Sequence, residues 1–389
     1  MSFIRNPLLW QGLFALLFVA ALVWSNPVLA AFVPVLALLS AGYVLWRLLR
    51  ARRERLWAAA RVAPDRAPAR MPRITGEVAT PDETRAIDPE EMQRFVTSRV
   101  IGQEVVAGQL ARGIYRRLAQ ERRGKPVFTA LLSGPTGTGK TEIVKAVADY
   151  LYGDANSMFR VDCANVLGEA GLQTLIGSPK GFAGSGSWGA LTSHLRATPR
   201  TVLLFDEVEK AVPSPTAPMA KLLLSLLDEG VCTEQSDGTR VSATEAVIVL
   251  TSNAAQDKLG AIFQRFRDEP DQLTRATKDA LRDYFAPEFL ARIDLVTTMS
   301  PLDSESRAKI VALHAGRIGR AYGVEIGEVD ASFVNEALHL WATLEGYGTR
   351  EVIRWIEETT ADQLIRIKGD GAARARLVWA DGEARVEAI

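Results

Sequence analysis

The sequence predicts an α/β fold in which helices cover both faces of a parallel sheet. Three short apolar runs, at residues 127–132, 202–205 and 247–250, have the composition of buried strands, and helical stretches separate them. Strands that alternate with helices in this way form parallel sheets between two helical layers. Beyond Pro301 the pattern becomes mainly helical and ends at residues 375–387, where alternating segments flank an Asp-Gly turn. We therefore expect a helical C-terminal subdomain that finishes in a β-hairpin.

Two apolar stretches precede this region and predict a pair of transmembrane helices. Residues 8–24 and 28–46 are almost wholly apolar, and Ser25, Asn26 and Pro27 separate them. At about 1.5 Å per residue, each stretch approaches the ~30 Å hydrocarbon core of a bilayer. Because Ser-Asn-Pro is a turn signal, two spans joined by a tight turn fit the sequence best. A cleaved signal peptide and a single bent or re-entrant segment are the alternatives.

Arginines set the expected orientation of this membrane hairpin. The turn has no Lys or Arg, whereas the second stretch is followed by Arg47, Arg50, Arg52, Arg53, Arg55 and Arg61. Positively charged flanks remain in the cytoplasm, which predicts a bacterial inner-membrane protein whose C-terminal region is cytoplasmic. The same arginines can bind the anionic head groups of the lipid bilayer.

The composition also suggests where the parts of the chain meet. Prolines interrupt any long helix in the Arg- and Ala-rich stretch after the membrane hairpin, so this stretch is expected to be a linker. Asp88 and Pro89, followed by two glutamates, then begin a helix with an N-cap and acidic residues at its positive end. The expected parts are a membrane hairpin at 1–50, a linker at 51–88, a large α/β subdomain at 89–300 and a lid subdomain at 301–389.

Charge and cysteine content exclude some classes of protein. The 389 residues include 46 Lys and Arg and 46 Asp and Glu, so no overall positive field attracts nucleic acid, and no nucleic-acid partner is expected. Cys163 and Cys232 lie far apart without metal-ligand spacing. This pattern predicts buried free thiols in a reducing compartment.

A glycine-rich motif follows the first predicted strand and precedes a predicted helix. It consists of the consecutive residues Gly134, Pro135, Thr136, Gly137, Thr138, Gly139, Lys140 and Thr141. Glycines let the backbone amides turn toward phosphate groups, and the following helix adds its positive end. Lys140 is expected to reach the β- and γ-phosphates of ATP, and Thr141 to ligate Mg²⁺.

Two later strands end in residues suited to ATP hydrolysis. The run at 202–205 is followed by Asp206, expected to hold Mg²⁺, and Glu207, expected to activate the attacking water as general base. A solvated strand end is the alternative for this pair. Asn253 closes the run at 247–250 and is expected to orient the water near the γ-phosphate, with a helix cap or turn amide as the alternative.

From about Arg99 to the C-terminus the chain resembles the C-terminal ATPase ring of the Clp-type AAA+ unfoldases and disaggregases. The matching segments occur in the order of that family, at residues 100–103, 134–141, 202–210, 251–253, 287–294 and 348–350. The resemblance implies a P-loop AAA+ αβα sandwich with a C-terminal lid. It also implies ATP hydrolysis in a homo-oligomer, expected to be a hexameric ring that acts on polypeptide substrates.

The resemblance assigns roles to four further residues. Val100 and Ile101 would line the adenine pocket. Arg292 would be the arginine finger that reaches the nucleotide of the neighbouring subunit, and Arg350 would sense nucleotide within its own subunit. A guanidinium suits both roles because it stays charged and binds phosphate oxygens in a planar fork. The proline that follows the lid arginine in the family is Glu351 here, and a surface ion pair is the alternative for each arginine.

The family's pore loop, Gly-Tyr-Val-Gly, corresponds to Gly-Phe-Ala-Gly at residues 181–184. Phe182 would grip a threaded chain through its ring, with a buried core position as the alternative. Trp188 is either a second grip or a residue packed beneath the loop. Residues 258–263 lie where peptidase-docking relatives carry a hydrophobic loop, but they lack a clear match, so a peptidase partner is not predicted.

These features favour a membrane-anchored, ATP-driven unfoldase that threads polypeptides through a ring. The alternative is a membrane-bound ATPase that remodels a partner complex without threading. A nucleic-acid motor is disfavoured by the neutral net charge and by the absence of a recognition motif.

Overall fold

The structure of this protein is a computed structural model. The residues that it describes are 87–120, 124–154, 157–179, 181, 187–212, 214, 216–343 and 348–389. In this part of the chain, no helix has both the length and the apolar character required to cross a bilayer. The two segments expected to form the membrane hairpin, 8–24 and 28–46, lie outside it.

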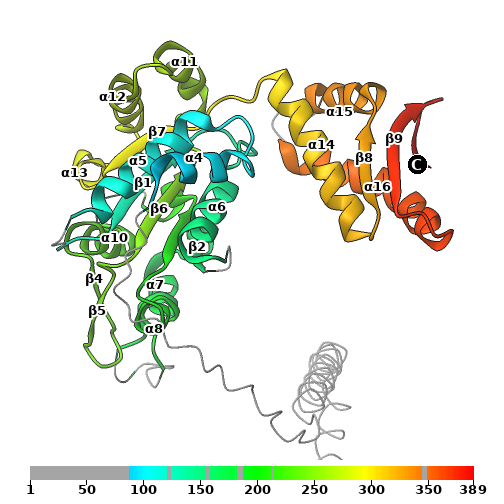
Figure 1. The fold of residues 1–389 in the computed structure, drawn as a ribbon. Helices are drawn as coiled ribbons and strands as arrows, with labels where there is room; N and C mark the ends of the chain where they lie inside the picture. Colours follow the sequence, from blue (N-terminus) through cyan, green and yellow to red (C-terminus); the bar gives the residue numbers. More distant parts are fainter. Residues whose placement is uncertain are drawn as a thin grey trace, which may run out of the picture. The chain divides into compact units, whose positions relative to one another are not determined.

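A parallel sheet forms the centre of the larger subdomain (Figure 1). Its strands are β1 (Phe128–Ser133), β2 (Met158–Asp162), β3 (Val202–Asp206), β6 (Val247–Ser252) and β7 (Leu295–Thr298). Their spatial order is β2-β3-β6-β1-β7, and every neighbouring pair is parallel. The predicted α/β fold with a parallel sheet is therefore confirmed.

Helices surround this sheet, and a short antiparallel pair, β4 (Val231–Thr233) and β5 (Arg240–Ser242), projects from it. The helices are α4 (Pro89–Thr97), α5 (Glu104–Leu118), α6 (Lys140–Tyr152), α7 (Gly168–Ile176), α8 (Ala190–Ala197), α9 (Val208–Ala211), α10 (Pro218–Glu229), α11 (Gln256–Phe266), α12 (Pro270–Leu281) and α13 (Pro287–Ala291). The predicted helix start is confirmed, since Asp88 Oδ1 accepts the amide hydrogen of Glu90 at 2.9 Å.

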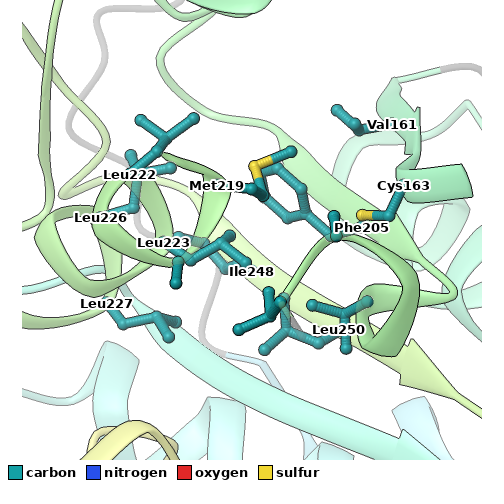
Figure 2. Packing of buried hydrophobic residues seen from close by; sticks show 14 of the residues in the cluster. Val161, Cys163, Phe205, Met219, Leu222, Leu223, Leu226, Leu227, Ile248 and Leu250 are labelled. Atoms are coloured by element: carbon teal, nitrogen blue, oxygen red, sulfur yellow. The ribbon is translucent and has the colours of Figure 1, made fainter. Parts of the chain in front are cut away.

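The strands bury both of their faces, which explains their continuous apolar sequence. Successive side chains of a strand point to opposite faces. Phe205 of β3 packs with Ile248 and Leu250 of β6 in one core, beneath α10 (Figure 2). Leu204 of β3 packs in a second core, together with residues of α4, α5 and α6. The central sheet is thus packed on both faces, and residues at the carboxyl ends of its strands are held at fixed positions.

Both cysteines are buried within this subdomain, and neither forms a disulfide. Burial raises the pKa of each thiol, Cys163 and Cys232, to about 12. The predicted free buried thiols are therefore confirmed.

The C-terminal subdomain has its own small sheet and core. Its elements are α14 (Ser304–Ala321), β8 (Glu325–Val329), α15 (Ala331–Thr343), α16 (Thr349–Gly369), β9 (Arg374–Ala380) and β10 (Glu383–Ala388). The predicted hairpin is present, and its turn residues Asp381 and Gly382 have φ values of 54° and 81°. Strand β8, which pairs in parallel with β9, was not predicted from the sequence.

Candidate active site

The turn between β1 and α6 consists of residues 134–139. Gly139 adopts φ +95° immediately before α6, in a region of backbone space that glycine enters without strain. A Cβ atom on Gly139 would lie 3.1 Å from Val100 Cγ1, so the buried Val100 packs directly against the turn. Helix α6 begins at Lys140, and the first amides of a helix have no partners within it. Such amides form a binding site for phosphate groups.

Lys140 is buried at the centre of this turn and is 8% exposed. Its ammonium donates hydrogen bonds to the carbonyls of Gly134 (2.7 Å) and Pro135 (2.8 Å) and to Asn253 Oδ1 (2.7 Å). Burial lowers the pKa of Lys140 from 10.5 to about 8, although nearby carboxylates, foremost that of Asp206, oppose the shift. A bound phosphate would take the place of these neutral acceptors and favour the charged form of the lysine.

Asp206 and Thr141 bring hard oxygen atoms together beside Lys140. Asp206 Oδ2 lies 3.4 Å from Thr141 Oγ1, whereas Oδ1 accepts a hydrogen bond from Thr251 Oγ1. Adjacent ligands of an octahedral Mg²⁺ ion are about 3 Å apart, so Thr141 and Asp206 fit one ion. Among the described residues, no group of three or more His, Cys, Asp or Glu could hold a metal ion. Mg²⁺ held by one or two protein ligands completes its coordination with water and substrate phosphate oxygens, and the same would apply here.

Arg160, which the sequence analysis did not single out, also contacts Asp206. Its Nη2 lies 2.6 Å from Asp206 Oδ2, the oxygen that faces Thr141. Arg160 belongs to the edge strand β2, next to β3, and no local motif marks it. Arg160 reaches Asp206 because β2 pairs with β3, and this contact could not be recognised in the sequence.

Glu207 occupies a strained backbone position at the end of β3. It adopts φ +55° and ψ +49°, a left-handed conformation that is unfavourable for a residue with a side chain. Its amide donates to Thr251 Oγ1 at 3.2 Å, which helps to hold this conformation. Because the hydroxyl of Thr251 also donates to Asp206, one side chain fixes both acidic residues.

Asn253 bridges Lys140 and Glu207. Its Oδ1 accepts from Lys140, and its Nδ2 lies 3.4 Å from Glu207 Oε1. Its own amide donates to Glu209 Oε1 at 3.2 Å. Asn253 therefore lies between the expected phosphate-binding lysine and the expected general base.

Arg350 lies beside the phosphate-binding turn of its own chain. The preceding residue, Thr349, begins α16 and donates from Oγ1 to the carbonyl of Gly137 at 2.5 Å. A Cβ atom on Gly137 would lie only 2.8 Å from the nitrogen of Thr349, so glycine permits this close approach. The positive charge of Arg350 is one of the factors that lower the pKa of Lys140.

Arg292, in contrast, lies at the opposite edge of the sheet. Its carbonyl accepts a hydrogen bond from Thr129 Oγ1 (3.4 Å), near the start of β1, whereas the phosphate-binding turn follows the end of β1 at Ser133. At about 3.3 Å per residue, Thr129 and Ser133 are some 13 Å apart. The described structure thus groups the other predicted catalytic residues at the carboxyl edge and leaves Arg292 at the amino edge.

The side chain of Arg292 is 32% exposed and has two partners within the chain. Nη1 donates to the carbonyl of Glu288 at 2.8 Å, and Nε lies 3.4 Å from Asp228 Oδ2. Hydrogen bonds from Lys125 and from Arg292 lower the pKa of Asp228. A cavity of about 410 Å³ beside these groups leaves room around the guanidinium.

Gln103 connects the phosphate-binding turn to the junction between the subdomains. It is fully buried, and its Nε2 donates to the carbonyls of Thr138 (3.1 Å) and Ser300 (3.0 Å). Its Oε1 accepts the amide hydrogen of Ser300 at 2.9 Å. Ile101, expected to contact adenine, is half-buried against the core of the C-terminal subdomain. The sequence analysis included Gln103 in a matching segment but assigned it no role, because its partners are as many as 197 residues away.

Phe182 lies outside the described residues, but Trp188 is described. The indole of Trp188 packs against the core next to α8, and its Nε1 donates to Asp237 Oδ2 at 3.1 Å. The guanidinium of Arg196 lies 4.6 Å from the ring. These contacts favour the packing interpretation of Trp188 over a second grip.

Residues 258–263, which correspond in position to a peptidase-docking loop, lie within helix α11. Leu259 and Phe263 of this segment are 0% and 6% exposed. Its largest apolar side chains therefore contribute to the core of the subdomain.

Comparison with known proteins identifies the domain that contains this site. The profile of the AAA domain, Cdc48 subfamily, matches residues 125–296. The mitochondrial chaperone protein ClpB4 of Arabidopsis thaliana is 33% identical over 291 residues, which cover 72% of this chain and 30% of that protein. The chaperone protein ClpB of Helicobacter hepaticus is 34% identical over 292 residues, which cover 73% of this chain and 33% of that protein.

This chain is also similar to a subunit of a protease and to a chain of a solved structure. The ATP-dependent Clp protease ATP-binding subunit ClpE of Bacillus subtilis is 32% identical over 298 residues, with 74% of this chain and 40% of that protein covered. A closed-state cryo-EM reconstruction of Hsp104 with ATPγS and FITC casein gives a TM-score of 0.62 at 26% identity. That comparison covers 77% of this chain and 51% of the Hsp104 chain. The chain thus spans only 30–40% of the length of these three curated relatives.

Proposed function

The chain is an ATPase with a Clp-type AAA domain, and on that premise we propose that it unfolds or remodels polypeptides as a ring of identical subunits. In the proposed reaction, water attacks the γ-phosphorus of ATP and the bond to ADP breaks. Glu207 accepts the proton of the attacking water, and Asn253 orients that water. The contact between Asn253 Nδ2 and Glu207 supports this pairing of roles.

The remaining residues of the site bind and orient the nucleotide. Lys140 and the amides at the start of α6 hold the phosphates, while Val100 and Ile101 contact the base. Mg²⁺, held by Thr141 and Asp206, would neutralise the charge that develops on the phosphate oxygens.

The position of Arg292 is the observation that carries the proposal of a ring. Arg292 lies at the amino edge of the sheet, and Lys140 lies at the carboxyl edge. A guanidinium so placed serves a nucleotide bound by another subunit, as arginine fingers do. Contacts of this head-to-tail kind generate closed rings when the rotation closes, and a hexamer is the proposed size.

Mixing two inactive variants tests this arrangement directly. Lys140→Ala removes nucleotide binding from its own subunit, and Arg292→Ala removes the finger that serves a neighbour. Each variant alone should be inactive, whereas an equimolar mixture should recover up to about a quarter of wild-type turnover, because a quarter of random interfaces combine both intact residues. Phosphate release and the mass of the assembly are the measurements. A mixture as inactive as its components would contradict the sharing of sites between subunits.

We further propose that Phe182 contacts a polypeptide threaded through the ring. Support comes from described residues before and after Phe182 in the sequence, which form hydrogen bonds with the connection between β4 and β5. Glu234 is fully buried, and it accepts hydrogen bonds from the amide of Gly189 (2.9 Å) and from Thr192 Oγ1. The amide of Gln235 donates to the carbonyl of Ile176 at 2.7 Å. A loop with both ends held in this way can transmit force to a bound chain.

Remodelling of a partner complex without threading is the second candidate function. The departure of Gly-Phe-Ala-Gly from the family's Gly-Tyr-Val-Gly favours this candidate. A ring that releases a subunit from a partner complex, but leaves a folded tagged substrate intact, would support it.

We also propose that residues 8–24 and 28–46 anchor the protein in a bacterial inner membrane, with the ATPase domain in the cytoplasm. Support comes from the apolar composition of both segments and from the arginines that follow them. A reporter fused after Ile389 should give a cytoplasmic signal. A periplasmic signal would refute this topology.

A further inference from the structure

Glu209 is an acidic residue close to the catalytic centre for which the proposed reaction has no role. It belongs to α9, the single helical turn that follows β3 and the two acidic residues at its end. Its Oε1 accepts the amide hydrogen of Asn253 at 3.2 Å. Because β3 and β6 are parallel neighbours, this hydrogen bond links the two strand ends where the catalytic groups lie.

The hydrogen bond fixes the backbone of the residue that orients the other groups. Asn253 reaches Lys140 through Oδ1 and Glu207 through Nδ2, so a small rotation of its backbone would break both contacts. From the side of β1, the amide of Gly134 donates to the carbonyl of Ser252 at 3.2 Å. Glu209 supports the same segment from the side of β3.

The second carboxylate oxygen of Glu209 is also enclosed by the protein. Oε2 is buried, and within the described residues it has no hydrogen-bond partner. Burial of an unpaired carboxylate oxygen destabilises a folded protein. Polar groups retained despite such a penalty are concentrated at functional sites. The hydrogen bond to Asn253 and the nearby positive charge of Lys140 together explain why Glu209 faces inward.

We propose that Glu209 is a positioning residue for ATP hydrolysis, which holds Asn253 in place through its main-chain amide. The inference rests on the role proposed above for Asn253. Glu209 does not touch the nucleotide in this arrangement. Besides accepting the hydrogen bond from Asn253, its negative charge raises the pKa of Lys140, against the larger effect of burial. Glu209→Gln separates the two effects, because it removes the charge and keeps the acceptor oxygen.

A double-mutant cycle on the intact protein tests this inference. Glu209→Ala removes the acceptor and should lower kcat about tenfold to a hundredfold, as expected when a catalytic group is misplaced by about 1 Å. Glu209→Gln keeps an acceptor oxygen and should retain turnover within about threefold of wild type. The Kd for a slowly hydrolysed ATP analogue should change by less than about threefold in both variants, since neither contacts nucleotide.

The cycle is completed with Asn253→Ala and the double variant. If Glu209 acts through Asn253, adding Glu209→Ala to Asn253→Ala should lower kcat by less than about twofold. Glu209→Met, which has a similar volume but no acceptor oxygen, replaces the alanine variant if that protein unfolds. Glu169→Ala, at an exposed acidic position in the first turn of α7, controls for the loss of a surface charge.

The possible failures are distinguishable. Normal kcat in the alanine and methionine variants, or fully additive effects in the double variant, would overturn the role of Glu209 while leaving that of Asn253 intact. Normal kcat in Asn253→Ala would instead remove the proposed role of Asn253, and the inference with it.

Discussion

The ammonium of Lys140 donates a hydrogen bond to the side-chain oxygen of Asn253 at 2.7 Å. This contact joins the phosphate-binding turn after β1 to the end of β6. Lys140 also donates to two carbonyl oxygens of its own turn, and burial lowers its pKa to about 8, although the carboxylate of Asp206 opposes the shift. Burial of this cation reduces the stability of the nucleotide-free protein, and a bound phosphate would offset that cost.

Lys140→Met should therefore stabilise the nucleotide-free protein, by about 1 kcal/mol, while abolishing its stabilisation by ATP. Thermal unfolding with and without Mg·ATP measures both effects. Lys145→Met is the matched control on the same helix, at a position whose side chain is 44% exposed and paired with Glu142. Stabilisation of Lys140→Met by Mg·ATP to the wild-type extent would contradict the assignment.

Glu207→Gln should lower turnover by at least about a hundredfold and leave ATP bound, because glutamine cannot accept the proton of the attacking water. Phosphate release gives the rate, and chromatography of the bound nucleotide gives its identity. Turnover at the wild-type rate would remove Glu207 from the proposed mechanism. The same variant, purified with its bound nucleotide, can retain its polypeptide substrate for identification.

Phe182→Ala should abolish unfolding of a tagged model substrate while changing ATP turnover by less than about twofold, since stacking and apolar contact with the threaded chain are lost. Loss of substrate fluorescence and phosphate release are measured in the same sample. Trp188→Phe, which keeps an aromatic ring in the packed position, is a useful companion variant. Normal unfolding by Phe182→Ala would favour remodelling without threading.

His314 in α14 should make the protein less stable in acid. Burial lowers its pKa from 6.5 to about 4, and the charge of Arg317 acts in the same direction, with Glu142 opposing it. Between these values the unfolded chain binds more protons than the folded one, so stability is lost as the pH falls from about 6.5 toward 4.

His314→Gln should remove this contribution and flatten the pH dependence. Denaturant unfolding between pH 4 and 7 provides the measurement, and His339→Gln, at an exposed position of α15, is the control. An unchanged slope in His314→Gln would contradict the assignment.

The central strands could be predicted because both of their faces are buried, which leaves a continuous apolar run in the sequence. β1, β3 and β6 lie within two residues of their predicted positions. The edge strand β2, Met-Phe-Arg-Val-Asp, is only partly buried, and its sequence therefore lacks such a run. Strand β8 is mostly exposed, and its five residues include two glutamates and a glycine. Its sequence therefore also lacks a continuous apolar run.

The candidate site could be predicted only where its residues form a local motif. The phosphate-binding turn is contiguous, and Asp206 and Glu207 directly follow a strand. Gln103, Arg160 and Glu209 could not be assigned in this way. Each of these residues contacts a partner that is distant in the sequence. Strand pairing or subdomain packing brings the two together, so their spacing in the sequence does not reveal the contact.

The hydrogen bond between Thr349 and Gly137 has a mechanical consequence. It attaches the first residue of α16 to the turn that would contact the phosphates, and α16 is 21 residues long. At about 1.5 Å per residue this helix extends some 30 Å, so a tilt of about 10° at its first turn displaces the far end by about 5 Å. If the turn shifts on phosphate release, α16 would act as a lever arm that enlarges the shift at its far end.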